Sequence, residues 1–125
     1  MTKVKVYLAS PYTNGNQEEN TKLQIKAGYE LLELGYYPYL PLLTHYIQVS
    51  YPTYKYDWLD LDFAYLEVCD VLIRLRPKDK NDLEIPSPGA DKEIKFAEEN
   101  KIPIFNFETV EEMIEYLTKN PFETE

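Results

Sequence analysis

Short apolar runs and amphipathic segments alternate along the chain, and this alternation predicts strands separated by helices. Runs rich in β-branched and aromatic residues are the predicted strands, at residues 3–10, 36–41, 70–75 and 102–107. Segments with apolar residues at helical spacing are the predicted helices, at residues 17–34, 56–69, 87–100 and 110–120. The longest stretches between them are a tyrosine-rich loop before residue 56 and a polar loop at residues 76–86.

Local signals mark several of these boundaries. Asn16 and Glu19 have the spacing of a capping box at the start of the first helix, and Gly35 stands where that helix is expected to stop. Ser87 and Pro88 have the order of a cap and first turn at the start of the third helix. The prolines of residues 36–41 are expected to keep the second strand short.

Strands that alternate with helices predict a parallel sheet with right-handed crossovers and helices on both faces. We expect an α/β fold, a flavodoxin-like or Rossmann-like three-layer sandwich of about four strands in the order 2-1-3-4. Residues 1–120 are expected to form one domain, and residues 121–125 a frayed tail. In such sheets ligands bind beyond the carboxyl ends of the strands where the strand order reverses, which here lies between strands one and three.

Composition narrows the class of partner. The chain has 125 residues and a net charge of −9, and its two arginines, Arg74 and Arg76, lie together near the end of the third strand. A nucleic-acid binder usually displays a basic face, so this balance argues against a nucleic-acid polymer and leaves open one small anion near the arginine pair.

The sequence also bears on the expected compartment. No segment is apolar enough to span a membrane, and the first residues do not have the pattern of a signal peptide. The single cysteine, Cys69, excludes an internal disulfide and suits a reducing cytoplasm, and its apolar surroundings favour an inert thiol. One histidine and one cysteine are too few for a metal site, so we expect neither metal nor cofactor.

Glu93 is a carboxylate on the predicted inner face of the third helix. Ala90 and Ala97, three residues before it and four after it, share that face. An inner-face carboxylate is costly unless it is paired, hydrogen-bonded or functional, and a nearby helix N-terminus favours its ionised form, which suits a nucleophile. The alternative is a first-turn glutamate that only complements the helix dipole.

Asp62 breaks the apolar stripe of the second predicted helix. It lies three residues after Leu59 and four before Leu66, so it falls within the stripe that these residues define. Burial would raise the pKa of Asp62, as a general acid requires. The alternative is a structural acid that caps a nearby loop.

Tyr7 lies near the carboxyl end of the first strand, where its hydroxyl could reach the crevice, although most such tyrosines are core residues. Two inner-face carboxylates on separate helices, both directed at one crevice, suggest glycosidic chemistry. In the retaining scheme one carboxylate attacks the anomeric carbon and the other transfers protons.

The stretches "VYLASPY", "DLDFAYLEVCDVLIRL" and "SPGADKEIKFAEENKIPIF" together resemble the nucleoside 2-deoxyribosyltransferase superfamily, which includes the deoxynucleoside 5′-monophosphate N-glycosidases. The resemblance covers roughly residues 3–106 and is greatest to the small phage and bacterial branch of the superfamily. Each motif is short, but their order and spacing are fairly specific.

The resemblance implies a role for each matching residue. Glu93 would be the nucleophile, Tyr7 would hydrogen-bond it, and Asp62 would contact the sugar or base and transfer protons. Ser87 and Gly89 match positions that hold the 5′-phosphate in the monophosphate hydrolases. The implied reaction cleaves or exchanges the N-glycosidic bond of a 2′-deoxynucleoside or its 5′-monophosphate through a deoxyribosyl–glutamate intermediate, with water or a second base as acceptor.

Further substrate contacts are expected from Ser10 and Tyr12 in the loop after strand one. His45 is expected either to face the pocket, as histidines of related small members do, or to be a loop residue without a role. The loop after strand one lacks the arginine that the monophosphate hydrolases carry there. Phosphate would then have to meet Ser87 and backbone N–H groups, or Arg76, and a free nucleoside becomes more plausible.

Two segments suggest additional features. The loop at residues 76–86 is longer than in the compact hydrolases, which suggests a lid or an altered base specificity. The aromatic run at residues 46–58 could stack on a base, but such residues more often build interfaces. Because relatives complete their sites across subunits, the resemblance implies a homodimer or higher homo-oligomer.

Two alternatives belong to other classes. A non-catalytic nucleotide-binding protein, acting as a sensor or sequestering agent, could keep the same fold, but binding alone does not require a nucleophile. A flavodoxin-like signalling domain is disfavoured because the first strand ends in "ASPY" rather than in an acidic pair.

Overall fold

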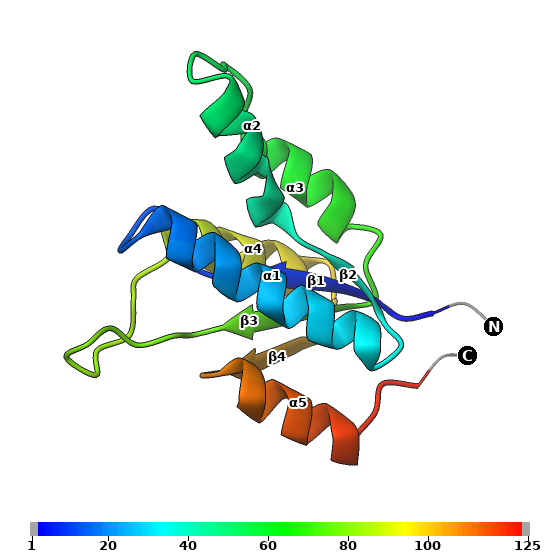
Figure 1. Cartoon of the computed structure of the whole chain (residues 1–125). Helices are drawn as coiled ribbons and strands as arrows, with labels where there is room; N and C mark the ends of the chain where they lie inside the picture. The colour runs from blue at the N-terminus through cyan, green and yellow to red at the C-terminus, as the bar shows by residue number, and fades with distance from the viewer. Residues whose placement is uncertain (1–2, 124–125) are drawn as a thin grey trace.

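Four parallel strands form the centre of the computed structural model, which describes residues 3–123 (Figure 1). Their order is β2-β1-β3-β4, as predicted. The strands are β1 (Lys5–Ala9), β2 (Tyr37–Tyr39), β3 (Val71–Leu75) and β4 (Ile104–Phe107). The helices are α1 (Gln17–Glu33), α2 (Thr44–Ser50), α3 (Trp58–Leu66), α4 (Pro88–Glu99) and α5 (Val110–Lys119), with the 3₁₀ turn η1 (Pro41–Leu43) before α2.

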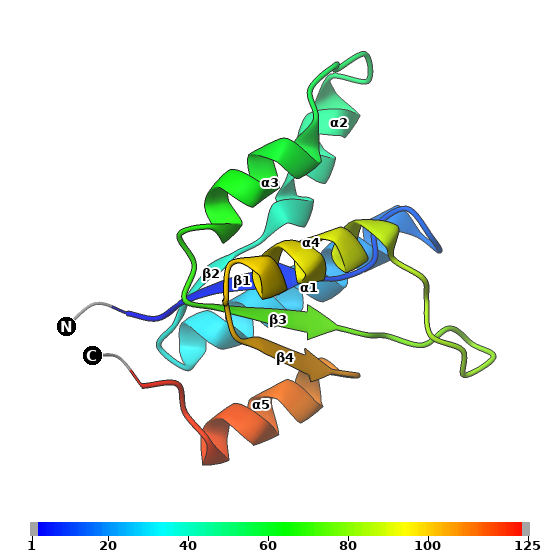
Figure 2. The same ribbon diagram turned by 180° about the vertical axis from the view of Figure 1, so that it is seen from behind.

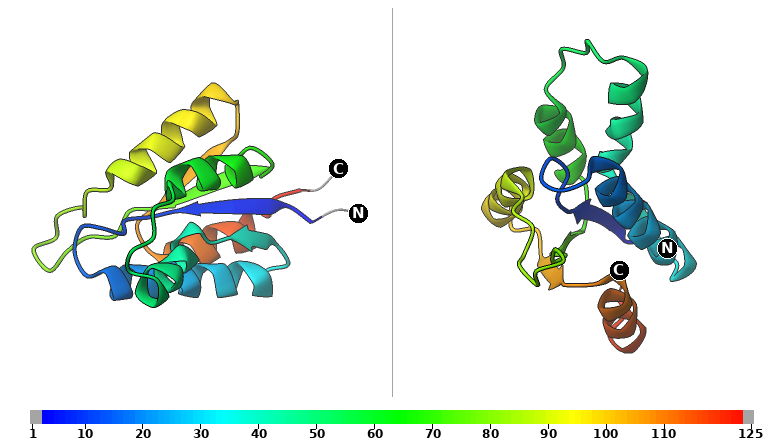
Figure 3. Two further views of the ribbon diagram at one scale, coloured as in Figure 1. Left: turned by 90° about the horizontal axis from the view of Figure 1, so that it is seen from above. Right: turned by 60° about the vertical axis from the view of Figure 1, so that its left-hand side comes forward.

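Helices cover both faces of the sheet, so the predicted three-layer α/β class is confirmed. Alternate strand residues point to opposite faces. Val6 and Leu8 of β1 belong to the core cluster beneath α1 and α5, whereas Tyr7 and Ala9 belong to a second cluster beneath α3 and α4. Figure 3 shows these two pairs of helices on opposite sides of the strands. Tyr7 therefore lies on the α4 face because of its position in the β1 alternation.

Side-chain caps fix where the helices begin. The side chains of Asn16, Asp57, Ser87 and Thr109 each accept a hydrogen bond from a backbone N–H in the first turn of the helix that follows. Gly35, with φ of 94°, lies just past the end of α1, in a conformation that favours glycine. These residues confirm the predicted starts of the first and third helices and the predicted stop of the first.

The segment after β2 differs from the prediction. In place of a tyrosine-rich loop, η1 and α2 occupy residues 41–50, and only residues 51–57 link α2 to α3. Figures 1 and 2 show α2 and α3 extending together beyond the sheet. The signal for α2 is weak because this helix has only seven residues, no side-chain cap and several β-branched and aromatic residues, which disfavour helix formation.

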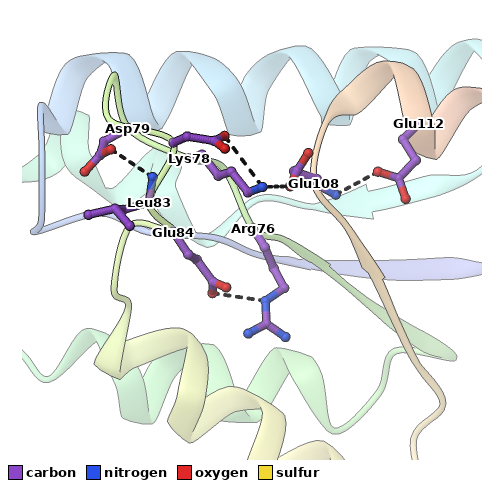
Figure 4. Close-up of polar contacts among 8 residues, drawn as sticks. Arg76, Lys78, Asp79, Leu83, Glu84, Glu108 and Glu112 are labelled. Carbon is purple, nitrogen blue, oxygen red and sulfur yellow. Dashed lines mark hydrogen bonds and ion pairs between the residues drawn. The ribbon is translucent and has the colours of Figure 1, made fainter.

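The polar loop at residues 76–86 is held by ion pairs (Figure 4). Arg76 Nε lies 3.0 Å from Glu84 Oε2, and Lys78 Nζ lies 2.8 Å from Glu108 Oε1, just beyond β4. An isolated antiparallel bridge joins Lys78 to Glu84 across the loop. These contacts attach the loop to the β4 side of the molecule.

The end of the chain is only partly covered by the structure. Phe122 packs against Tyr36 and Phe105, with ring centroids 5.3 and 5.0 Å away, and its N–H donates to the Tyr36 hydroxyl. Residues 124–125 of the expected frayed tail lie outside the described residues. Between residues 3 and 123, no helix is both long and apolar enough to cross a bilayer.

Candidate active site

A cavity of about 210 Å³ opens at the carboxyl ends of the strands, where the sequence predicts the binding crevice. The segment after β1, the turn η1, and helices α3 and α4 all contribute to its walls. The lining residues are Ser10, Tyr12, Thr13, Gln24, Pro41, Leu42, Thr44, Trp58, Leu59, Asp62, Ser87, Pro88, Gly89, Ala90 and Glu93.

Glu93 is buried on the inner face of α4, with 6% of its surface exposed. The hydroxyl of Tyr7, itself fully buried on β1, donates a hydrogen bond to Glu93 Oε2. Burial, followed by the charge of Glu93, raises the pKa of Tyr7 well above its usual value, so this hydroxyl stays protonated and acts as a donor. The predicted pairing of Tyr7 with Glu93 is therefore present in the structure.

Burial is the largest influence on the charge of Glu93 and raises its pKa to about 8. The hydrogen bond from Tyr7 lowers the pKa, the negative charge of Asp62 raises it, and the positive charge of Arg74 lowers it. Ionised Glu93 is thus accessible near neutral pH, but it depends on its hydrogen-bond donor and on the nearby cation.

Asp62 also lies buried in the cavity wall, with 8% of its surface exposed. Burial, aided by the charge of Asp57, raises its pKa to about 7. Its Oδ1 atom is buried and has no hydrogen-bond partner among the described residues. A carboxyl group in this state is protonated for part of the time near neutral pH and can donate or accept one proton, as general acid–base chemistry requires.

Gln24 is a buried wall residue that the sequence analysis missed. Its Nε2 donates to Ser10 Oγ at 2.8 Å, and its Oε1 accepts from the N–H of Leu42 at 2.9 Å. This side chain therefore fixes η1 against the end of β1. The available signal was its position three residues before Ala27 and seven before Leu31, on the inner face of α1.

Four of the five predicted substrate contacts line the cavity, namely Ser10, Tyr12, Ser87 and Gly89. His45 does not line it. It lies on α2, where its Nδ1 is 2.7 Å from the hydroxyl of Tyr12. His45 therefore contacts a lining residue without itself lining the cavity. Sequence reasoning placed His45 in a loop, where this pairing could not be foreseen.

Several lining residues from the segment at 41–59 were also missed. Leu42, Thr44 and Leu59 enter the wall because η1, α2 and α3 fold back beside β1. Trp58, from the aromatic run expected either to stack on a base or to build an interface, lines the same wall. By contrast, none of residues 76–85 lines the cavity, and the lid suggested for this loop is not found over it. Asn14 Nδ2 instead donates to the Pro86 carbonyl, which ties the two segments that flank the cavity.

The first turn of α4 offers limited capacity for an anion. Pro88 has no N–H, while the N–H groups of Ala90 and Asp91 bond to the side chain and the carbonyl of Ser87. A Cβ added to Gly89 would meet nothing within 4 Å, so this glycine leaves open space at the cavity. A bound group could therefore approach the Gly89 backbone closely.

None of the lysine, arginine and histidine side chains between residues 3 and 123 lines the cavity. Arg76 pairs with Glu84, and Arg74 Nη2 lies 2.8 Å from Asp91 Oδ1. The predicted anion site near the two arginines thus has both of them engaged with carboxylates. No group of three or more histidine, cysteine or acidic side chains among residues 3–123 is placed to hold a metal ion.

Cys69 is less buried than its apolar surroundings suggested. Its thiol donates to the Tyr65 carbonyl at 3.3 Å. Burial and the charge of Asp70 raise the pKa of the thiol to about 11, which keeps it protonated and poorly nucleophilic at neutral pH.

The fold is similar to that of solved structures, among them a nucleoside-processing enzyme. A 2-deoxyribosyltransferase from the psychrotolerant bacterium Bacillus psychrosaccharolyticus matches the chain with a TM-score of 0.58 and 22% sequence identity, over 83% of this chain and 72% of that one. That enzyme is described as a biocatalyst for the synthesis of antiviral and antitumoral nucleosides. No protein-family model and no curated protein sequence matches the chain. The resemblance expected from the sequence is thus confirmed for the fold.

Replacing Glu93 by glutamine tests the burial of its carboxyl. An exposed glutamate titrates near 4.5, whereas the pKa of Glu93 is about 8, so folding favours its protonated form. The protonated Glu93 side chain lowers the stability of the fold least below pH 4.5, where the unfolded chain is protonated too. The free energy of unfolding then falls as the pH rises from 4.5 toward 8. We expect Glu93→Gln to be more stable than the wild type by on the order of 4 kcal/mol at pH 8, and by about 1 kcal/mol or less at pH 5.

Urea unfolding at the two pH values measures this difference. Glu98→Gln, a change at an exposed residue of the same helix, is the matched control. Its effect on the free energy of unfolding should not increase between pH 5 and pH 8. An equal effect of Glu93→Gln at both pH values would contradict a buried carboxyl with a raised pKa.

Proposed function

We propose that the chain belongs to the nucleoside 2-deoxyribosyltransferase superfamily and cleaves or exchanges the N-glycosidic bond of a 2′-deoxynucleoside. The observation that carries this proposal is the buried Tyr7–Glu93 pair beside Asp62 in the cavity wall. The fold of the bacterial 2-deoxyribosyltransferase supports it independently. A binding protein has no need of a nucleophile and an acid in one cavity, whereas a retaining glycosyl transfer uses both.

In the first step Glu93 attacks C1′ of the deoxyribose. Tyr7 occupies Oε2, so Oε1 is the oxygen that forms the new bond to C1′. The bond from C1′ to the base nitrogen breaks, and its electron pair leaves with the base. Asp62 donates its proton to the departing base, which makes the base a better leaving group.

In the second step the deoxyribosyl–Glu93 ester is released. Water attacks C1′ in a hydrolase, and a second base attacks it in a transferase. The C1′–oxygen bond breaks, its electron pair returns to the Glu93 carboxylate, and the Asp62 carboxylate takes the proton of the nucleophile. Each residue then returns to its starting protonation state.

A free nucleoside fits the described site better than a 5′-monophosphate. No lysine or arginine among the described residues lines the cavity, and within the first turn of α4 only the Gly89 N–H has no partner among those residues. A phosphate dianion usually needs several donors or a cation. Trp58 and Leu59 provide apolar surface for a base, while Ser10 and Ser87 supply hydroxyls in the same wall.

Incubation with a panel of 2′-deoxynucleosides and their 5′-monophosphates, with and without a second free base, tests this proposal. Chromatography should show free base or an exchanged nucleoside, with nucleosides turned over faster than monophosphates. Glu93→Ala should abolish the reaction because the nucleophile is lost, while Glu98→Ala on the exposed face of α4 should not change it.

The variant Asp62→Asn separates the roles of the two acids. It should slow release of the base at least 100-fold, the usual size of a general acid–base contribution. It should also move the acid limb of the pH profile to lower pH, because the charge of Asp62 raises the pKa of Glu93. Tight binding of one panel member without turnover would instead favour the sensor or sequestering protein.

We also propose that the chain assembles as a homo-oligomer through the face formed by η1, α2 and α3. This face carries an apolar groove of about 420 Å³, lined by Pro38, Tyr39, Leu40, Leu43, Thr44, Ile47, Leu61 and Tyr65. Ile47 and Tyr65 are 44% and 48% exposed in the single chain. Thr44 lines both this groove and the cavity, so a second copy on the groove would support the cavity wall from behind.

Light scattering during size-exclusion chromatography should give at least twice the 14.8 kDa mass of one chain. Ile47→Lys places a charge in the groove and should shift the mass toward the single chain. Leu83→Lys, which changes an even more exposed apolar residue on the distant loop, should leave the assembly intact. A wild-type mass of one chain would refute the assembly.

A further inference from the structure

Arg74 is a buried cation at the carboxyl end of β3. Only 7% of its surface is exposed, although arginine is seldom buried unless it is paired. Its neighbours Ile73 and Leu75 belong to the core beneath α1 and α5, so the strand alternation directs Arg74 to the face that carries Tyr7. The same face is covered by α4, the helix that supplies Glu93.

The visible partner of Arg74 is Asp91, in the first turn of α4. Arg74 Nη2 lies 2.8 Å from Asp91 Oδ1, but the Asp91 side chain is 66% exposed and that of Arg74 only 9%. Water screens an exposed carboxylate, so this pair alone gives little compensation for burying the cation. A second anion inside the structure would restore the balance, and Glu93 lies two residues further along the same helix.

Glu93 in turn has few sources of positive charge. The groups acting on it come from every packed element: Tyr7 from β1, Asp62 from α3, Tyr39 from β2 and Arg74 from β3. Tyr39 and Tyr7 are neutral, and Asp62 can only add negative charge. Arg74 is therefore the cation that acts on the proposed nucleophile among the described residues, and it does not line the cavity.

We propose that Arg74, held in place by Asp91, is a positioning residue that serves as the counterion of Glu93 and keeps this carboxylate ionised without touching the substrate. The guanidinium suits this role because it is always charged and has several fixed donors with which it can engage Asp91. The catalytic part of this proposal rests on the proposed function, whereas the electrostatic coupling of Arg74 to Glu93 does not.

The counterion affects both steps of the proposed reaction. In the first step Glu93 must be ionised to attack C1′, and the Arg74 charge increases the ionised fraction. In the second step the C1′–oxygen bond breaks and the carboxylate regains its negative charge, which Arg74 stabilises. Arg74 would thus support attack by Glu93 and its release without entering any bond change.

A double-mutant cycle in unfolding tests the coupling without any need for turnover. Arg74→Met is introduced into the wild type and into Glu93→Gln, and urea unfolding is followed at pH 5 and pH 9. At pH 5 Glu93 is protonated, so the loss caused by Arg74→Met should be the same in both backgrounds. At pH 9 the loss should be larger in the wild-type background, because an ionised Glu93 is then left without its counterion.

The control and the contradicting result are defined by the same cycle. Arg76→Met changes an arginine that pairs with Glu84 outside the cavity and should show no coupling to Glu93 at either pH. If Arg74 only packs against the sheet and pairs with Asp91, its loss will be the same in both backgrounds at both pH values, and the proposal is wrong. Should Arg74→Met not fold, Arg74→Gln replaces it in the cycle.

Activity then tests the catalytic consequence. Arg74→Met should lower kcat/KM roughly tenfold at pH 6, where little Glu93 is ionised, and less near pH 8. Arg74→Lys keeps the charge and should recover most of the lost kcat/KM. Asp91→Asn should lower kcat/KM in the same pH range, but by less than Arg74→Met does. A loss that is equal at all pH values and is not rescued by lysine would overturn the catalytic role.

The two measurements distinguish the possible failures. Coupling in the unfolding cycle without turnover of any panel member would leave Arg74 as the counterion of Glu93 and would remove the proposed reaction. Turnover that depends on Glu93, without coupling between Arg74 and Glu93 in the unfolding cycle, would support the proposed reaction and refute the role of Arg74 as counterion.

Discussion

The contact between the Tyr7 hydroxyl and the Glu93 carboxylate joins the sheet to α4 inside the protein core, and the rest of the site is arranged around it. An ionised carboxylate at this depth is unfavourable unless donors and a cation compensate for the lost water. Tyr7 provides the donor from β1, and Arg74 provides the charge from β3. The strand order matters for the chemistry because β1 and β3 are neighbours in the sheet. Tyr7 on β1 and Arg74 on β3 therefore lie on the same face, beneath α4.

Asp62 makes ionisation of Glu93 still less favourable. The charge of this second buried acid opposes ionisation of Glu93, and burial raises both pKa values, to about 7 for Asp62 and about 8 for Glu93, so each acid is partly protonated near neutral pH. Burying these two carboxyl groups lowers the free energy of unfolding at neutral pH, because both would ionise more readily in the unfolded chain. Such a loss is typical of sites in which the protonation of buried groups serves a reaction.

The sequence predicted what periodicity can encode. The four strands and the inner-face positions of Glu93 and Asp62 follow from the spacing of polar and apolar residues. The strand order was expected from the fold class and is confirmed. The sequence did not predict α2, whose weak helix formers are held by contacts with η1 and α1, nor the wall that Leu42 and Gln24 build. Those features arise from tertiary packing between distant segments. His45 shows the same limit, since its partner Tyr12 lies 33 residues away.

The proposed reaction requires that Glu93 form a covalent bond to the sugar, and this bond would change the mass of the protein. The chain is mixed with a reactive 2′-deoxynucleoside, quenched in acid within the first turnover, digested and examined by mass spectrometry. We expect the α4 peptide to gain the mass of one deoxyribosyl group, located on Glu93 and absent from Glu93→Gln. Release of the base with no labelled peptide at any quench time, or with the label on another residue, would contradict the mechanism.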